Sequence, residues 1–173
     1  MSNAALELGS ARHIEGTLFL FIEMAFVDRL RTGVPLLNPT GFTAFQSLFD
    51  FERLRAFQTE ETIRYLDALL EDLLGMLESE QWDVALLRSR EVVDATIDAY
   101  LHHLGNTDPT RKWRSVYLER LKDGSERHQR FAKTFWRLQF PDGNALRQDP
   151  IACHSHLESC VRFANEVVTW IQG

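Results

Sequence analysis

Arg147 and His154 are the two residues whose types and spacing suggest a chemical reaction. They lie seven residues apart, on either side of the Asp149-Pro150 pair that is expected to start the last helix. An arginine guanidinium holds phosphate oxygens through paired hydrogen bonds, and an imidazole transfers a proton near neutral pH. The pair therefore predicts cleavage of a phosphodiester without a metal. The alternative is that His154, on the apolar face of the predicted helix, is partly buried and satisfied by one hydrogen bond.

Cys153, His156 and Cys160 follow at positions i, i+3 and i+7, which places them on one face of the same predicted helix. Thiolates and imidazoles are ligands for zinc or copper, but no residue suggests itself as a fourth ligand. The alternative, which we favour, is that both cysteines are small apolar residues of the core. We therefore expect no metal site and no cofactor. The cysteine Cα atoms would lie about 10 Å apart, too far for a disulfide bond, and reduced thiols are typical of the cytoplasm.

Several motifs of common enzymes are absent from the chain. It contains no GxGxxG, GxxxxGK[ST], GxSxG, HExxH or CxxC pattern and no Glu-x-x-His segment. These absences disfavour the common nucleotide-loop enzymes, serine hydrolases, zinc proteases and di-iron oxidases. A helical sensor of haem or of another small molecule stays as an alternative, with His13, His128 and His154 as candidate axial ligands.

Helices are expected to position these residues. Apolar residues recur at helical spacing along most of the chain, and no segment shows the alternating pattern of a strand. The pattern predicts an all-α fold, an up-and-down helical bundle of about six or seven helices with short connections. The expected helices cover residues 11–31, 39–57, 59–79, 81–104, 110–122, 125–138 and 150–170.

Capping residues suggest where several of these helices begin and end. Asn38 and Asp149 each precede a proline, the arrangement of an N-cap followed by the first helical residue. Thr59 is expected to cap the third helix, because two glutamates follow it and suit the first turn. Gly105 is expected to follow the end of the fourth helix.

Length and composition favour one compact unit. The chain has 173 residues, 45% of them hydrophobic, which is enough for one core. We expect an N-terminal helical pair in residues 1–58, packed on a bundle of residues 59–173. The longest apolar stretch, residues 18–22, is too short to span a membrane, and the N-terminus lacks the features of a secretory signal. These features predict a cytoplasmic protein without a membrane partner.

Charge is unevenly distributed along the chain, whose net charge is −6. Residues 59–98 hold eleven acidic residues and three arginines, whereas residues 111–147 hold ten basic and four acidic residues. The basic segment is interleaved with aromatic residues, a composition typical of surfaces that bind nucleic acid. The alternative is that acidic and basic helices pair within the bundle. The nucleic-acid-binding candidates are Arg111, Lys112, Arg114, Arg127, Arg130, Lys133 and Arg137.

From residue 59 onward the order of features resembles the HEPN family, small helical bundles of prokaryotic toxin–antitoxin and defence systems. A broken long helix is followed by "YLHHLGNTDP" (100–109), a basic helix pair, "LQFPDG" (138–143) and a terminal helix. The family carries similar YLxxxGxxxP and Arg-Tyr-Pro-Asp patterns at the corresponding places. The resemblance covers about 115 residues of the chain, and residues 1–58 have no counterpart in it.

The resemblance implies two functions. Ribonuclease members carry an Arg followed by a His after four to six residues, which corresponds here to Arg147 and His154. The spacing in this chain is at the long end, Gln148 stands where the family usually has Asn, Asp or His, and Pro150 lies inside the interval. Members without the motif act as binding modules. We therefore expect a module for RNA, a nucleotide or a protein partner, with a homodimer as one arrangement, and we keep the ribonuclease as the alternative.

Overall fold

The computed structural model describes residues 26–106 and 111–173, and every regular element within these ranges is a helix. The prediction of an all-α fold is confirmed. A short helical segment at residues 26–32 falls at the end of the predicted helix 11–31, whose remainder lies outside the described residues. The elements that follow are α3 (Pro39–Gln46), α4 (Phe51–Glu78), α5 (Trp82–His103), η1 (Arg111–Trp113), α6 (Arg114–Lys122), α7 (Glu126–Gln139), α8 (Gly143–Gln148) and α9 (Pro150–Gln172).

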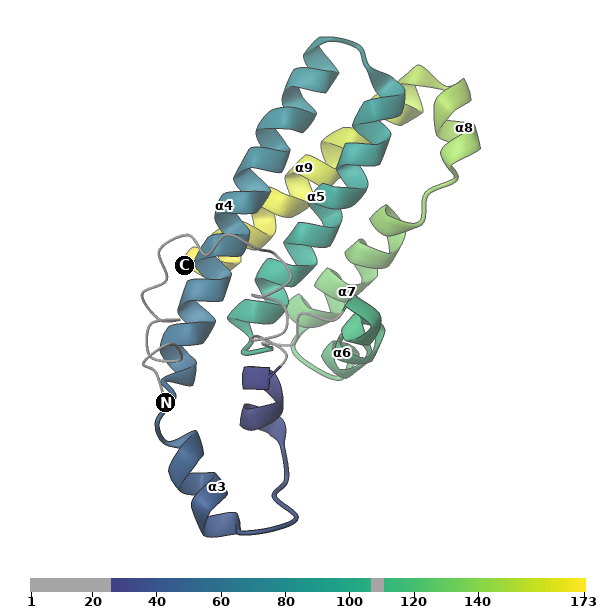
Figure 1. The fold of residues 1–173 in the computed structure, drawn as a ribbon. Helices are drawn as coiled ribbons and strands as arrows, with labels where there is room; N and C mark the ends of the chain where they lie inside the picture. Colours follow the sequence, from purple (N-terminus) through teal and green to yellow (C-terminus); the bar gives the residue numbers. More distant parts are fainter. Residues whose placement is uncertain (1–25, 107–110) are drawn as a thin grey trace.

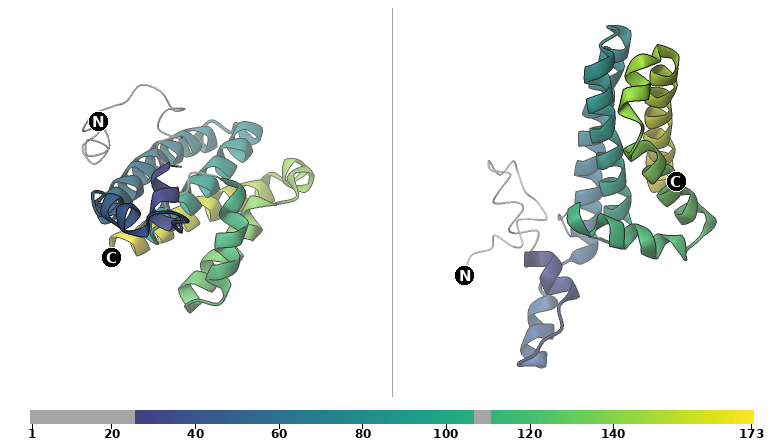
Figure 2. Two further views of the ribbon diagram at one scale, coloured as in Figure 1. Left: turned by 60° about the horizontal axis from the view of Figure 1, so that its bottom comes forward. Right: turned by 90° about the vertical axis from the view of Figure 1, so that its right-hand side faces the viewer.

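The long helices form two layers. α4 and α5 lie side by side in antiparallel directions, and α9 packs against both (Figure 1). α7 packs against α5 and α9 and runs antiparallel to α9. A view turned by 90° shows α4 and α5 as one layer and α7 to α9 as the other (Figure 2). α6 crosses near one end of the layers, and α3 projects beyond that end together with residues 26–32.

The space between the layers is filled by apolar side chains. Leu66 and Leu73 of α4 pack with Val92 of α5 and Leu157 of α9, and all four are fully buried. Phe131 of α7 is also fully buried, in a second cluster that includes residues from α5, α6 and α9. Truncation of such a side chain to alanine costs about 3 to 5 kcal/mol, so α7 is held firmly on α5 and α9.

The N-terminal boundary of α4 differs from the sequence prediction. The helix predicted for residues 39–57 ends at Gln46, and α4 begins at Phe51 because the Asp50 carboxylate accepts a hydrogen bond from the Arg53 amide. Thr59 is therefore not an N-cap. It lies inside α4, where its hydroxyl donates to the Arg55 carbonyl oxygen at 2.8 Å.

The boundaries around the last helices are mostly as predicted. Asp149 caps α9 by accepting from two amides at 3.0 Å, and Pro150 is the first helical residue. Gly105 follows α5 with a φ of 87°, the left-handed conformation that favours glycine. One helix was not predicted: α8 lies between the predicted helices 125–138 and 150–170, and Asp142 caps it.

Candidate functional site

The candidate site is a hollow between α7 and α9, named here the arginine hollow. Its volume is about 290 Å³. On α7, positions 130, 134 and 137 recur at helical spacing and face α9, whose positions 159, 162 and 166 face back. The antiparallel packing of the two helices brings these groups together. The lining residues are Arg130, Thr134, Arg137, Ser159, Arg162, Phe163 and Glu166.

The arginine hollow carries an excess of positive charge. Arg130 is paired with Glu166 at 2.6 Å, and Glu166 is the only carboxylate among the lining residues. Arg137 and Arg162 are exposed and form no ion pair with any residue in 26–106 or 111–173. Two guanidinium groups thus face this hollow without a carboxylate partner from the described chain, so an anion would be attracted to it.

Two titratable neighbours of Arg137 do not supply the missing negative charge. Burial lowers the pKa of His156, and the charge of Arg137 adds to that shift, so the imidazole is neutral at pH 7. Burial raises the pKa of the Cys160 thiol to about 12, so it is neutral as well. The two side chains contact each other, with 3.6 Å between Sγ of Cys160 and Nε2 of His156.

Hydroxyl groups supplement the guanidinium groups. Ser159 donates its proton to the Ser155 carbonyl oxygen at 2.8 Å, and Thr134 lines the hollow from α7. A hydroxyl can rotate to donate to a ligand oxygen, and a guanidinium offers two parallel N–H groups to a phosphate. The arrangement is therefore suited to a phosphate group.

The basic residues predicted to bind nucleic acid are distributed over η1, α6 and α7. Arg130 and Arg137 line the arginine hollow, and Lys133 is exposed on the same helix one turn from Arg137. Arg127 lies over the Trp170 ring at 5.5 Å, and Lys112 lies over the Trp113 ring at 5.1 Å.

Of the two remaining nucleic-acid-binding candidates, the side chain of Arg114 is described and that of Arg111 is not. Arg114 is only 11% exposed, and its guanidinium bonds Asp94 and Asp98 of α5. Its charge is therefore neutralised inside the protein. The Arg111 side chain lies outside the described residues.

Five residues of the hollow were not among the candidates from the sequence: Thr134, Ser159, Arg162, Phe163 and Glu166. Thr134, Ser159 and Arg162 carry no motif, and Ser159 and Arg162 lie beyond the basic segment of residues 111–147. The available signal was the spacing of Ser159, Arg162 and Glu166 on the polar side of the last helix. This spacing indicates a site only when it is known that α9 packs against α7.

Arg147 and His154 lie near the same corner of the fold but line different hollows. Arg147, at the end of α8, binds Asp83 through Nε at 2.9 Å and lines a hollow with Trp82. The His154 ring packs edge-on against Trp82 at 6.2 Å and lines a hollow between α4 and α9. Both side chains are about half exposed. Neither of these two hollows is lined by both side chains.

The cysteines belong to two different parts of the core. Cys153 packs with α4 and α5 residues, whereas Cys160 packs with residues of α5, α6 and α7. In residues 26–106 and 111–173, no group of three or more His, Cys, Asp or Glu side chains could hold a metal ion. Of the candidate haem ligands, His128 packs edge-on against Tyr100 at 6.0 Å, and His13 lies outside the described residues.

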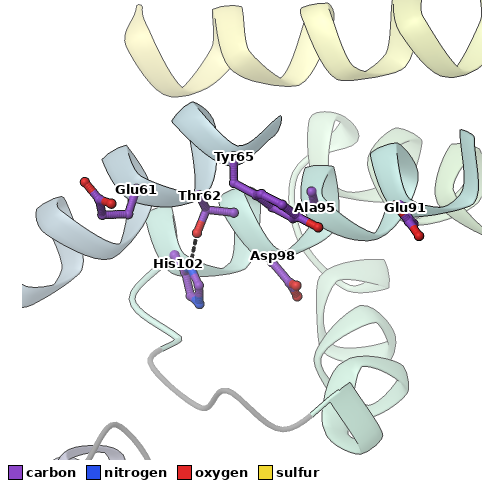
Figure 3. A pocket seen from close by; sticks show the side chains of 7 residues that line it. All are labelled: Glu61, Thr62, Tyr65, Glu91, Ala95, Asp98 and His102. Atoms are coloured by element: carbon purple, nitrogen blue, oxygen red, sulfur yellow. Dashed lines mark hydrogen bonds between the residues drawn. The ribbon is translucent and has the colours of Figure 1, made fainter. Parts of the chain in front are cut away.

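A second hollow lies between α4 and α5 (Figure 3). Its volume is about 340 Å³, and Thr62 and His102 are hydrogen-bonded across it at 3.0 Å. The hydroxyl of Thr62 also bonds the Gln58 carbonyl oxygen at 2.8 Å. With that hydroxyl proton donated to Gln58, Nδ1–H of His102 is the donor to Thr62. Burial lowers the pKa of His102, so this imidazole is neutral at pH 7.

The carboxylates of this second hollow are already paired. Glu61 bonds Arg64, Glu91 bonds Arg88, and Asp98 bonds Arg114. Little negative charge is left to attract a cation, so the arginine hollow is the stronger candidate for ligand binding. The residues lining the second hollow are Glu61, Thr62, Tyr65, Glu91, Ala95, Asp98 and His102.

The comparisons with known proteins do not assign the chain to a family. No family model matches the chain, and neither a curated protein nor a solved structure is significantly similar to it. Within the described ranges, none of the helices has both the length and the apolar character that crossing a membrane requires.

Proposed function

We propose that the protein is a helical binding module whose arginine hollow holds the phosphate group of a nucleotide or nucleic acid. The observation that carries the proposal is the convergence of Arg130, Arg137 and Arg162 from two helices on one hollow with a single carboxylate. A phosphate oxygen pair matches the donor geometry of a guanidinium, and partial desolvation between two helices strengthens that contact.

The proposal includes the wider assignment made from the sequence. In it, the chain is an HEPN-like, up-and-down bundle of six or seven helices that acts as a binding module. The order of α4, α5, the basic pair α6 and α7, the corner at Pro141 and the terminal helix α9 supports it. A cytoplasmic location is part of the same proposal, because both described cysteines are free thiols.

The helices that carry the hollow also support a binding role. Phe131 of α7 and Phe163 of α9 pack at 5.4 Å beneath the polar residues, and both are buried. The arginines are thus mounted on helices whose spacing is fixed by the core. A site on rigid elements loses less conformational entropy when it binds a ligand than a site on loops does.

The test is the affinity for a fluorescently labelled single-stranded oligonucleotide, measured by anisotropy over a range of salt concentrations. Binding through phosphates predicts that the logarithm of the affinity falls linearly with the logarithm of the salt concentration. The double variant Arg137→Glu with Arg162→Glu should bind at least about tenfold more weakly, with a shallower salt dependence.

The control is Arg53→Glu combined with Arg90→Glu. Both arginines are exposed and lie outside the arginine hollow, so these changes alter the net charge by the same amount. Circular dichroism melts establish that each variant is folded. Equal losses of affinity in the two double variants, or an affinity that does not depend on salt, would exclude the proposed site.

A further inference from the structure

Two aromatic rings are stacked where α7 ends, one from the helix and one from the residue that follows it. Trp136 and Phe140 have ring centroids 5.6 Å apart and an angle of 18° between their planes. Trp136 is half buried and packs against the core, where Phe135 meets it edge-on at 5.3 Å. Phe140 is 65% exposed. The stack is therefore anchored on its inner side and open on its outer side.

Two basic residues of α7, Lys133 and Arg137, lie close in the sequence to the two stacked rings. Lys133 and Arg137 lie four residues apart on one side of α7, and Phe140 follows directly after that helix, three residues beyond Arg137. Both are exposed and form no ion pair within residues 26–106 and 111–173. Arg137 also lines the arginine hollow, and in the sequence it directly follows Trp136 of the aromatic stack.

The extent of the cationic surface matches a chain of phosphates better than one phosphate. Arg130 and Arg137 are separated by about 10 Å along the helix axis, given the rise of an α-helix. Arg162 adds a third guanidinium from α9. A ligand that used all of these groups together with the ring stack would carry several phosphates and at least one free base.

We propose that the ligand is single-stranded nucleic acid, with a backbone phosphate in the arginine hollow and the adjoining base stacked on the outer face of Phe140. This inference rests on the proposed function. A single strand can turn a base out and lay it on an aromatic ring, whereas the bases of a duplex are stacked on each other. Phe140 supplies the base platform, and Lys133 and Arg137 hold the phosphates beside it.

The experiment compares two labelled oligonucleotides of equal length, an oligouridylate and its fully abasic counterpart, against wild-type protein and Phe140→Ala. The abasic strand retains the phosphates but offers no base. We expect Phe140→Ala to bind the oligouridylate about tenfold more weakly and the abasic strand with unchanged affinity. Phe140→Trp should retain the wild-type affinity for both strands. A duplex of the same length should bind wild type more weakly than the single strand.

The control is Phe45→Ala, which removes another exposed phenylalanine, on α3, with 44% of its surface exposed. It should leave both affinities unchanged. If Phe140→Ala lowers the affinities for the oligouridylate and the abasic strand equally, the stacking site is excluded. The same holds if it lowers neither affinity. The proposed phosphate site is unaffected by either result. If wild type binds neither strand, both proposals fail. A wild-type preference for the duplex also overturns the stacking site, and a deoxyribose strand tested in parallel distinguishes RNA from DNA.

Discussion

Arg114 of α6 and Asp94 of α5 are joined by an ion pair of 2.7 Å between Nη1 and Oδ1, and the same guanidinium bonds Asp98 through Nε at 2.9 Å. This cluster fixes the short helix α6 against α5. Removal of the arginine would leave two carboxylates side by side, with the Asp94 side chain 18% and the Asp98 side chain 33% exposed. Breaking a buried pair in this way costs about 3 kcal/mol.

We therefore expect Arg114→Met to lower the free energy of unfolding by about 3 kcal/mol, measured by urea denaturation. Arg88→Met is the control. Arg88 also contacts two carboxylates, of Asp72 and Glu91, but these are more than half exposed. Its removal should cost less than about 1 kcal/mol. Equal losses in the two variants would show that burial does not distinguish the clusters.

The buried imidazole of His102 is expected to make the folded protein less stable in mild acid. Burial lowers the pKa of this imidazole below the ordinary value of 6.5, and the charge of Arg114 adds to the shift while Asp98 opposes it. The unfolded chain therefore binds the proton more readily than the folded chain. The folded state should lose stability as the pH falls below 6.5, until the folded-state pKa is passed.

The measurement is the free energy of unfolding at about pH 7.5 and about pH 5 for wild type and His102→Asn. The asparagine amide can replace the Nδ1–H donor to Thr62 but does not titrate in this range. The difference between the two pH values should be smaller in the variant than in wild type. An identical difference would mean that His102 contributes nothing to the acid sensitivity.

Gly75 offers a way to stabilise the fold. It lies within α4, and a Cβ atom added there would meet no other atom within 4 Å. Alanine restricts the unfolded chain more than glycine does, so Gly75→Ala should raise the free energy of unfolding by about 0.5 to 1 kcal/mol. Gly105→Ala should have the opposite effect, since φ is +87° at that position. Thermal melts of both variants check the two signs.

The comparison of Asp149 with Asp50 explains which parts of the fold are visible in the sequence. Asp149 precedes a proline, and both residues favour the same helix start, which the structure confirms. Asp50 is also an N-cap, but its neighbours continue the helical pattern on both sides, and Thr59 offered an equally good cap. Local chemistry alone could not decide between the two starts.

The residues of the candidate site could also be predicted only in part from the sequence, because the site depends on how the helices pack. Charge counting on the basic segment selected Arg130 and Arg137, which do line the arginine hollow. It also selected Arg114, because composition does not distinguish an exposed guanidinium from one that is held between two aspartates. Arg162 was missed because its position opposite Arg137 depends on the register between α7 and α9.

The two described thiols should be unreactive in the folded protein. Cys153 and Cys160 are both buried, and burial raises the pKa of each, for Cys160 to about 12. The thiolate is the reactive form, so a disulfide reagent at neutral pH should label neither residue until the chain unfolds. Labelling in urea should give two thiols for wild type and one for Cys160→Ala. Rapid labelling of native wild type would contradict the burial of these side chains.

The ribonuclease hypothesis predicts that bound RNA is cleaved, whereas the binding proposal predicts that it stays intact. Arg147 is held by Asp83 and lines one hollow, whereas His154 lines another, so the two side chains do not face one common phosphodiester in these two hollows. We expect end-labelled RNA to be recovered intact after incubation with the protein in EDTA, as judged on a denaturing gel. Cleavage by wild type that disappears in an identically purified, folded His154→Ala would instead establish the ribonuclease. Cleavage that persists in that variant would come from a contaminating nuclease or from other residues, because a mechanism built on His154 cannot proceed without the imidazole that moves the proton.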